Sequence, residues 1–147
     1  MIRGLCMNRL LELANKQNLQ YITPKTSVFE ASQVMSQNHI GSILVRDQGE
    51  VVGIFSERDL MNRVVTHGLD YTSTTVSDVM TKEIQMVSTE ENAESCYRLM
   101  KKLKCRHLPI QQQGKVIGMV SIRDILKWMI EDAQDENEQL KGYIQTQ

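Results

Sequence analysis

A short polar motif stands twice in the 147-residue sequence, with a serine, an arginine and an aspartate at fixed spacing. The first instance is GIFSERD at residues 53–59, and the second is GMVSIRD at residues 118–124. Each instance follows apolar residues and precedes a helical pattern, so Ser56 and Ser121 are predicted helix N-caps. An aspartate three residues later is typical of a capping box, which is a purely structural interpretation of the motif.

The arginine in each motif favours a bound anion as well. Arg58 and Arg123 would lie in the first turn of a helix, where the helix dipole disfavours a cation by about 0.3–1 kcal/mol. Free backbone N–H groups, a serine hydroxyl and an arginine together can bind phosphate, which would offset this cost. A carboxylate can accept hydrogen bonds from both hydroxyls of a ribose, so Asp59 and Asp124 have a second candidate role. Sugar and phosphate recognition together indicate a nucleotide.

The motif lies within an internal repeat, in which Gln48 aligns with Gln113 at an offset of 65 residues. Seven of thirteen positions are identical between residues 48–60 and 113–125, whereas chance matching at average composition gives about one. The alignment continues backwards without a gap, so the chain consists of two copies of a unit of about 60 residues. Two copies are too few for a solenoid, and we expect them to pack on each other.

Each copy predicts the same order of elements, β-α-β-β-α, from its apolar periodicity. The turn between the last two strands contains Gly49 in the first copy and Gly114 in the second, where glycine supplies a positive φ. We therefore expect a mixed α/β fold. The predicted elements are strands at 19–22, 42–45 and 51–55 with helices from Val28 and from Ser56 to Val65 in the first copy, and strands at 84–87, 107–110 and 116–120 with helices from Ala93 and from Ser121 to Ile130 in the second.

The segments that flank the repeat are predicted to be helical. A lead-in helix spans 8–17, and the C-terminal helix continues from 131 to 140 with an acidic face that we interpret as solvated. A connector with Gly68 and several serines and threonines spans 67–75. The expected divisions are a lead-in helix at 1–18, the first copy at 19–67, a linker at 68–76, the second copy at 77–133 and a helical tail at 134–147.

Composition excludes several classes of protein. The formal net charge of −1 argues against a general nucleic-acid binder. No run of about 18 uncharged apolar residues predicts a membrane span, and residues 1–14 lack the apolar core of a secretory signal. Cys6, Cys96 and Cys105 have unrelated spacings, so we expect reduced thiols that pack as apolar side chains, in a cytoplasmic protein.

Neither a metal site nor a catalytic site is predicted. Cys105 and His107 share one face of a predicted strand, but no second pair of ligands accompanies them, whereas a zinc site needs three or four ligands. The sequence contains no P-loop, no G-x-S-x-G motif and no nucleophile–base arrangement of known spacing. We therefore expect a protein without catalytic activity or a required cofactor; an enzyme with an unrecognised site is the least favoured interpretation.

The repeated unit resembles the cystathionine-β-synthase (CBS) domain, whose tandem pairs form the Bateman module. The resemblance rests on the β-α-β-β-α order and on the repeated G-h-h-S-x-x-D motif, where h is apolar, and it covers roughly residues 16–133. The segment TVSDVMT at 75–81 is also similar to the usual start of a second copy in this family. The resemblance implies two repeats related by a pseudo-twofold axis, with their sheets packed together and two clefts for adenosine-containing ligands between them.

The resemblance also implies roles for individual residues. Asp59 and Asp124 would hold ribose hydroxyls, and Ser56 and Ser121 would lie near the ribose or the α-phosphate. The middle strand of each copy would read the adenine edge through its backbone, and the turn before the first helix would complete each pocket. The implied base contacts are Ile43, Leu44 and Val45 in the first copy and Leu108, Pro109 and Ile110 in the second, the turn residues are Thr23, Pro24, Ser88 and Thr89, and the phosphate candidates are Arg58, Arg123, Arg106 and His107.

The two clefts are expected to differ in charge. Arg106 and His107 have Gly41 and Ser42 as counterparts in the first copy, so more positive charge gathers near Asp124. Charged hydrogen bonds to phosphate are among the strong ones. We therefore expect ADP or ATP to bind more tightly in the second cleft, and the first cleft to be weaker and nearer to AMP in preference.

These inferences favour a regulatory sensor that binds an adenine nucleotide (AMP, ADP or ATP) or a related adenosyl ligand such as S-adenosylmethionine or NAD. The alternative is a structural interaction module with empty or degenerate clefts. We expect a homodimer at micromolar concentration, because Leu126, Met129 and Ile130 would expose an apolar helix face. An unidentified regulated protein is the other expected partner, whereas nucleic acid and membrane are not.

Overall fold

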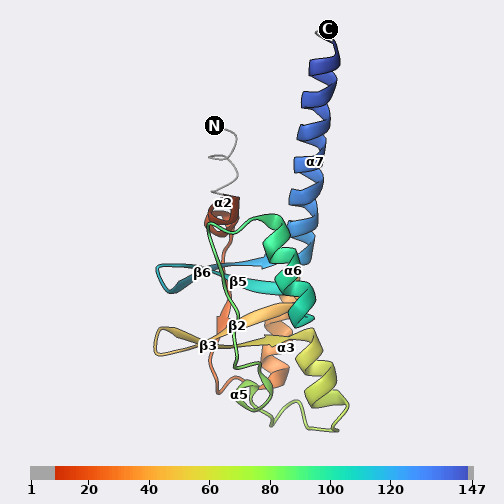
Figure 1. The fold of residues 1–147 in the computed structure, drawn as a ribbon. Helices are drawn as coiled ribbons and strands as arrows, with labels where there is room; N and C mark the ends of the chain where they lie inside the picture. The colour runs from red at the N-terminus through yellow and green to blue at the C-terminus, as the bar shows by residue number, and fades with distance from the viewer. Residues whose placement is uncertain (1–8, 146–147) are drawn as a thin grey trace. The chain divides into compact units, whose positions relative to one another are not determined.

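The computed structural model describes residues 9–145, which form two compact units (Figure 1). One unit consists of residues 18–85 and contains the first copy of the repeat. The other consists of residues 86–145 together with residues 9–17, so a segment from the start of the chain completes the second copy. Cys6 and the expected helix start at Asn8 lie outside the described residues.

In the unit of residues 18–85, a three-stranded sheet has the order β1-β2-β3. β1 is parallel to β2, and β2 is antiparallel to β3 with Ser42 opposite Ser56. Helix α3 begins after Ser27, whose hydroxyl accepts a hydrogen bond from the backbone N–H of Glu30 at 3.1 Å and so caps the helix. The elements are β1 (Tyr21–Ile22), α3 (Val28–Gln37), β2 (Ser42–Asp47), β3 (Glu50–Ser56), α4 (Glu57–Asp59), η1 (Leu60–Val65) and α5 (Val76–Val79).

The second unit repeats this plan with a sheet of order β4-β5-β6. Its core joins residues of α2, α6, α7 and the sheet, and includes Leu10, Met100, Ile110 and Ile125, each almost fully buried. The mixed α/β fold and the β-α-β-β-α order predicted from the repeat are therefore confirmed. The elements are α2 (Arg9–Lys16), β4 (Val87–Ser88), α6 (Ala93–Leu103), β5 (His107–Gln112), β6 (Lys115–Ser121) and α7 (Ile122–Gln145).

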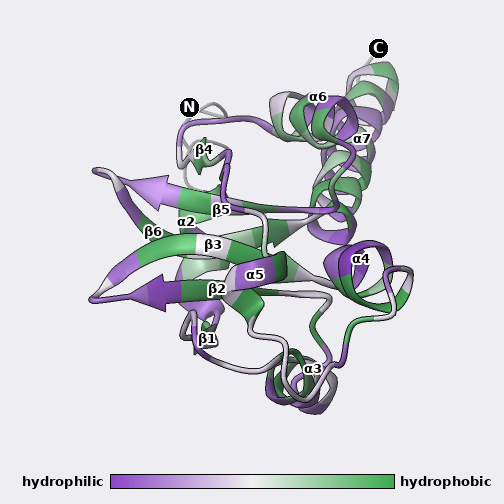
Figure 2. Ribbon diagram, turned by 90° about the horizontal axis from the view of Figure 1, so that it is seen from below, coloured by the Kyte–Doolittle hydropathy of each residue, from purple (hydrophilic) through white to green (hydrophobic). Residues whose placement is uncertain are grey.

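Each hairpin turns through a glutamine and a glycine that both have positive φ. The angles are 50° and 82° at Gln48 and Gly49, and 52° and 79° at Gln113 and Gly114. Two central residues of positive φ match the twist of antiparallel strands, as in a type I′ turn. The hairpin strands are hydrophobic in the middle and hydrophilic toward these turns (Figure 2).

Each compact unit contains the segment that precedes the other copy in the sequence. Helix α2, which precedes the first copy, packs on β6 of the second, and the Gln17 side chain accepts from Met119 N at 2.9 Å. The segment that precedes the second copy packs on β3 of the first, where Ile54 and Thr81 exchange backbone hydrogen bonds of 3.0 and 2.8 Å. We call this arrangement the segment exchange.

A glycine in the last strand makes room for each exchanged segment. A Cβ placed on Gly118 would lie 2.7 Å from Ala14 Cβ and 2.9 Å from Ala14 Cα, and a Cβ on Gly53 would lie 2.5 Å from Met80 Sδ. Real Cβ contacts are longer than this. A side chain at residue 118 would therefore displace the backbone of α2, whereas one at residue 53 would displace the Met80 side chain.

The last helix of the first copy differs from the prediction. The pattern predicts one α-helix from Ser56 to Val65, whereas a single α-helical turn, α4, is followed by a π-helix, η1. Its wide turn is closed by a hydrogen bond from Thr66 N to Met61 O at 3.0 Å. π-Turns are rare and often stand at functional sites. In the second copy α7 is α-helical from Ile122 and runs beyond the predicted Leu140, so the expected continuation is confirmed.

We expect Gly118→Ala to lower the free energy of unfolding by about 1–3 kcal/mol, because the new methyl group overlaps the backbone of α2. Gly142→Ala is the matched control, since a Cβ there meets no atom within 4 Å and alanine favours a helix by about 1 kcal/mol over glycine. Urea denaturation of both variants measures the difference. Equal stability of the two variants would contradict close packing of α2 on β6.

Candidate functional site

Both copies of the polar motif form a capping box at the start of their last helix. Ser56 N donates to Asp59 Oδ2 at 3.0 Å, and Asp59 N donates to Ser56 Oγ at 3.3 Å. The matching distances are 2.9 Å from Ser121 N to Asp124 Oδ2 and 3.2 Å from Asp124 N to Ser121 Oγ. The structural interpretation of the motif is therefore confirmed in both copies.

In the first copy the chain itself encloses the carboxylate. Asp59 is only 6% exposed. Thr81 Oγ1 donates to Asp59 Oδ1 at 3.2 Å, and Arg63 Nε lies 3.7 Å from the same oxygen. Arg63 Nη1 also donates to the carbonyl oxygens of Val79 and Met80, at 3.1 and 2.8 Å. Asp59 thus joins the last helix to the exchanged segment, and its oxygens are engaged by protein groups.

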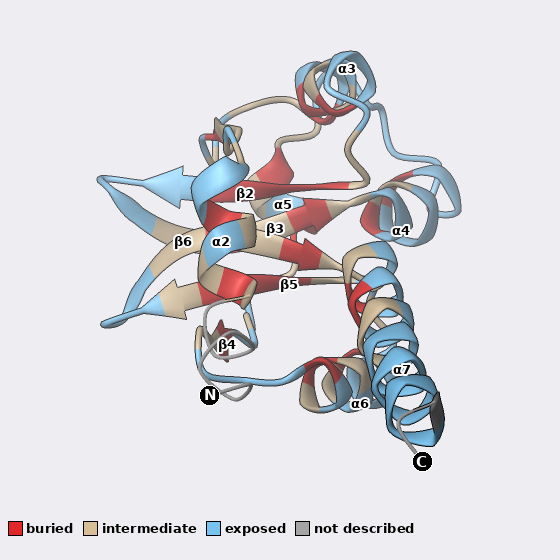
Figure 3. Cartoon of the chain, turned by 90° about the horizontal axis from the view of Figure 1, so that it is seen from above, coloured by how far each residue is buried: buried red, intermediate tan, exposed pale blue. Residues whose placement is uncertain are grey.

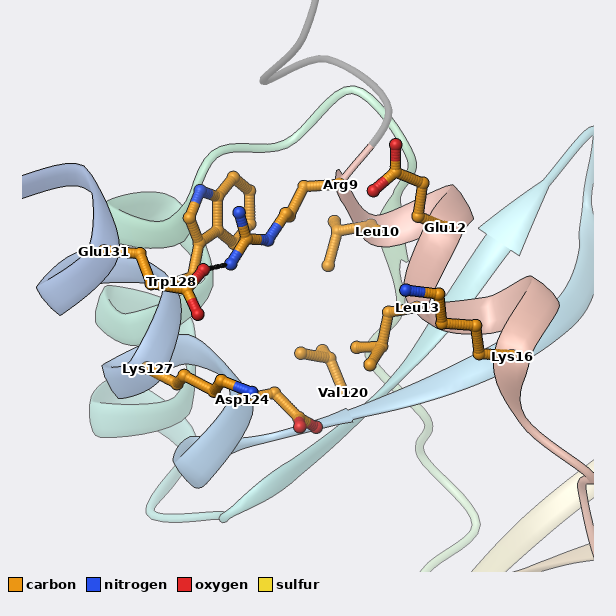
Figure 4. A pocket seen from close by; sticks show the side chains of 10 residues that line it. All are labelled: Arg9, Leu10, Glu12, Leu13, Lys16, Val120, Asp124, Lys127, Trp128 and Glu131. Carbon is orange, nitrogen blue, oxygen red and sulfur yellow. Dashed lines mark ion pairs between the residues drawn. The ribbon is translucent and has the colours of Figure 1, made fainter. Parts of the chain in front are cut away.

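In the second copy the equivalent surroundings are open. The repeat offset places Trp128 at the position of Arg63 and Lys16 at the position of Thr81. Asp124 is half-buried and lines a cavity of about 420 Å³ between α2, β6 and α7 (Figure 4). Helix α2 forms one wall of this cavity because the segment exchange brings it onto β6. The lining residues are Arg9, Leu10, Glu12, Leu13, Lys16, Val120, Asp124, Lys127, Trp128 and Glu131.

At one end of the cavity, Arg9 of α2 interacts with two side chains of α7. Arg9 forms an ion pair with Glu131, and its guanidinium lies 5.9 Å from the centroid of the Trp128 ring. A cation over an aromatic face is attracted by the ring quadrupole. Lys16 of α2 and Lys127 of α7 line the cavity from opposite walls (Figure 4). The cavity therefore combines an aromatic side chain, a carboxylate at a helix start and two lysines.

The residues expected to bind a base lie on the middle strands. β4 pairs with β5 only at Ile110 and Gln111, so within the described residues no strand covers Leu108 or Pro109 on that side. β1 likewise pairs only with Leu44 and Val45 of β2. The expected base contacts, residues 43–45 and 108–110, are all buried, and none of them lines the cavity at Asp124.

The expected phosphate residues fall into two groups. His107 stands opposite Ser121 in the β5–β6 ladder, and the carbonyl of Arg106 accepts from Ile122 N at 2.8 Å, so both lie beside the motif. Arg58 and Arg123 are exposed on their helices, and Arg123 does not line the cavity that Asp124 lines.

The expected turn residues precede the first helix of each copy. Thr23 N donates to Thr26 Oγ1 at 3.1 Å, and Pro24 O accepts from Ser77 N at 3.1 Å, so this turn is tied to the segment at α5. Ser88 ends β4, and Thr89 follows it.

Of the ten residues that line the cavity, the sequence analysis assigned a binding role only to Asp124. The nine it missed include Arg9, Lys16, Lys127 and Trp128. The repeat offset pairs Lys16 with Thr81 and Trp128 with Arg63. An alignment of the two copies could therefore have identified positions 16 and 128 as the equivalents of the two residues that contact Asp59. The offset does not predict the segment exchange, in which α2 packs on the second copy.

The buried thiol behaves as the sequence predicts. Cys96 is fully buried in the core, and this burial raises its pKa to about 11, with a smaller contribution from the charge of Glu91. The thiol is therefore neutral at physiological pH and packs as an apolar group. Among residues 9–145, no group of three or more His, Cys, Asp and Glu side chains has an arrangement that could hold a metal ion.

The fold and the repeated motif agree with the CBS family model, which matches residues 12–66 and 76–131. The chain belongs to the CBS-domain family. It contains two CBS domains in tandem, and proteins of this kind are regulatory or signal-transduction modules. The family boundaries follow the sequence repeat, whereas the compact units cross these boundaries through the segment exchange.

Several CBS proteins are similar over most of this chain. The mitochondrial CBS domain-containing protein CBSX3 of Arabidopsis thaliana is 31% identical over 130 residues, which span 85% of this chain and 63% of that protein. The CBS domain-containing protein YhcV of Bacillus subtilis is 32% identical over 71% of this chain and 74% of its own length.

Solved CBS structures have the same fold. A protein with CBS domains from Burkholderia ambifaria has a TM-score of 0.78 at 30% identity, covering 82% of this chain and 93% of its own. The hexameric CBS-CP12 protein from bloom-forming cyanobacteria has a TM-score of 0.69 at 28% identity, covering 75% of this chain and 66% of its own. No helix among the described residues is both long and apolar enough to span a membrane.

The two motif aspartates should differ in their effect on stability. We expect Asp59→Asn to lower the free energy of unfolding by about 1–3 kcal/mol, because it removes the charge that Arg63 and Thr81 face in a buried setting. Asp124→Asn should cost below about 1 kcal/mol, since asparagine still caps a helix. Chemical denaturation at pH 7 measures both values. A larger loss for Asp124→Asn would show that the enclosed contacts of Asp59 contribute little.

Proposed function

We propose that this chain is a non-catalytic regulatory module that binds an adenine nucleotide in the cavity at Asp124. The observation that carries the proposal is a half-buried carboxylate at a helix start that opens into about 420 Å³ of space. Ligand pockets commonly have volumes of about 300–1,000 Å³. Asp124 would accept the ribose hydroxyls, and Lys16 and Lys127 would face the phosphates.

In this proposal the first copy has a weaker role in binding the nucleotide. Asp59 accepts hydrogen bonds from Ser56 and Thr81 and lies beside Arg63, so a ribose would have to replace contacts that the protein already makes. Replacing buried, charge-assisted contacts costs free energy. We therefore propose that the Asp124 site binds more tightly and that Asp59 mainly stabilises its unit.

Calorimetric titration with ATP tests the assignment of the site. Asp124→Asn should weaken ATP binding at least about tenfold, which corresponds to about 1.4 kcal/mol. Asp59→Asn is the matched control, because it alters the same motif position in the other copy and should leave the affinity unchanged. If Asp59→Asn is the more damaging substitution, the ranking of the two sites is wrong.

A thermal-shift panel tests the class of ligand. A ligand at a hundredfold excess over its Kd stabilises the folded state by about 2.7 kcal/mol, so AMP, ADP or ATP should raise the Tm by several degrees. A preference for adenine predicts smaller shifts with GMP and GTP. Equal shifts with guanine nucleotides would contradict adenine recognition. No shift with any nucleotide, S-adenosylmethionine or NAD would favour the alternative, a structural interaction module with empty sites.

The proposal includes self-association and a regulated partner. The hexameric CBS-CP12 relative supports association between copies of CBS proteins, and we propose a homodimer for this chain. An unidentified protein would read the bound nucleotide. A cytoplasmic location remains a prediction, and the Arabidopsis relative is mitochondrial by name.

A further inference from the structure

The cavity at Asp124 contains one side chain suited to contact a nucleotide base. Residues 108–110, the expected base contacts of the second copy, are buried and do not line this cavity. Among the described residues ten line the cavity, and Trp128 is the one with an aromatic side chain (Figure 4). Stacking on an aromatic ring is a common way for a protein to bind a nucleic-acid base. A base in this cavity would therefore meet the indole of Trp128.

The spacing along α7 fits a nucleoside. Asp124 and Trp128 are four residues apart, so they share one helix face with about 5–6 Å between their Cβ atoms. Both lie in the first half of α7, which packs on its unit, whereas residues 133–144 are all exposed (Figure 3). In a nucleoside the base is attached to the ribose carbon next to the 2′-hydroxyl. A ribose whose hydroxyls bind Asp124 therefore carries its base within reach of the helical turn that contains Trp128.

The guanidinium of Arg9 lies beside this ring. It is 5.9 Å from the centroid of the Trp128 ring, and Arg9 forms an ion pair with Glu131. Trp128 itself is only 4% exposed. Arg46 lies closer to its own ring, at 4.0 Å from the centroid of Tyr21. Arg9 and Trp128 are thus near each other without the close contact of a stacked pair.

A base can enter between these two side chains after a small movement. Two stacked contacts of about 3.5–4.0 Å need about 7–8 Å in all, so Arg9 has to move outward by about 1–2 Å. The side chains of Arg9 and Glu131 are each 37% exposed, and ion pairs at this exposure contribute little to stability. The movement therefore costs little, and the base gains a ring on one face and a cation on the other.

We propose that the base of the bound nucleotide stacks between the indole of Trp128 and the guanidinium of Arg9, with Glu131 keeping Arg9 in place. The inference rests on the proposed function and adds the residues that hold the base. It also accounts for the weaker role of the first copy. The repeat offset places Arg63 at the position of Trp128, and Arg63 faces Asp59, so the first copy has an arginine where the second has the ring.

Tryptophan fluorescence tests the stacking on the unaltered protein. Trp128 is the single tryptophan of the sequence, so the whole tryptophan emission reports on this cavity. A stacked base quenches the fluorescence of an indole. ATP and adenosine should each cause a saturable loss of emission, with the same midpoint as the calorimetric Kd. Ribose 5-phosphate, which has the ribose and a phosphate without a base, should leave the emission unchanged.

A pair of arginine variants tests the contact on the second face of the base. Arg9→Gln should raise the Kd of ATP by about threefold or more, because a contact between a cation and a ring is lost. Adenosine should show the same loss, since it has no phosphate for Arg9 to bind. Arg46→Gln is the matched control, because it removes a cation beside a ring in the other unit and should change neither affinity. Thermal melting confirms that both variants fold.

The possible results separate this inference from the proposed function. No calorimetric binding of ATP to the wild-type chain would overturn the proposed function and this inference with it. If ATP binds and Asp124→Asn weakens it, an unchanged Trp128 emission would overturn the stacking while the site at Asp124 stands. Quenching by ribose 5-phosphate would overturn it as well. Equal affinities of Arg9→Gln and Arg46→Gln, or a loss in Arg9→Gln that is confined to ATP, would overturn the place of Arg9 on the base.

Discussion

A glycine in the last strand of each copy determines which segment packs beside each polar motif. Gly118 lets α2 lie directly on β6, and Gly53 lets Met80 lie directly on β3. Because interiors pack at crystal-like density, a methyl group added at residue 118 would move α2, and one added at residue 53 would move the Met80 side chain. The position of α2 then sets which side chains reach Asp124, and the position of residues 80–81 sets which reach Asp59.

The two capping boxes have the same local structure but different surroundings. Their internal hydrogen bonds are alike to within a few tenths of an ångström. What differs is the second layer: Arg63 and Thr81 enclose Asp59, whereas Trp128 and Lys16 stand near Asp124 without such bonds among those described. A carboxylate whose partners are all internal contributes to stability, and one that faces a cavity can bind a ligand.

The sequence predicts the elements well because the repeat supplies two readings of each. The hairpin strands, their turns and the N-cap serines follow from local patterns of period two, period 3.6 and turn chemistry. The leading strands are shorter than predicted: β1 covers only Tyr21–Ile22 of 19–22, and β4 is Val87–Ser88 instead of 84–87. Local patterns do not report the segment exchange, which is a long-range choice between two similar sheets. For the same reason the role of Arg63 and the cavity wall formed by α2 were not predicted. The π-helix of the first copy was not predicted either, because a pattern of period 3.6 indicates an α-helix.

The segment exchange has a consequence for how such a chain could arise. In a single-copy ancestor that kept this arrangement, the last strand of the sheet would be covered by the leading segment of another molecule. Association would then be a condition of folding and would depend on concentration. Gene duplication and fusion would make that step intramolecular, with an effective concentration in the millimolar range for a short connector. The duplicated copies could afterwards diverge, one keeping an accessible carboxylate and the other an enclosed one.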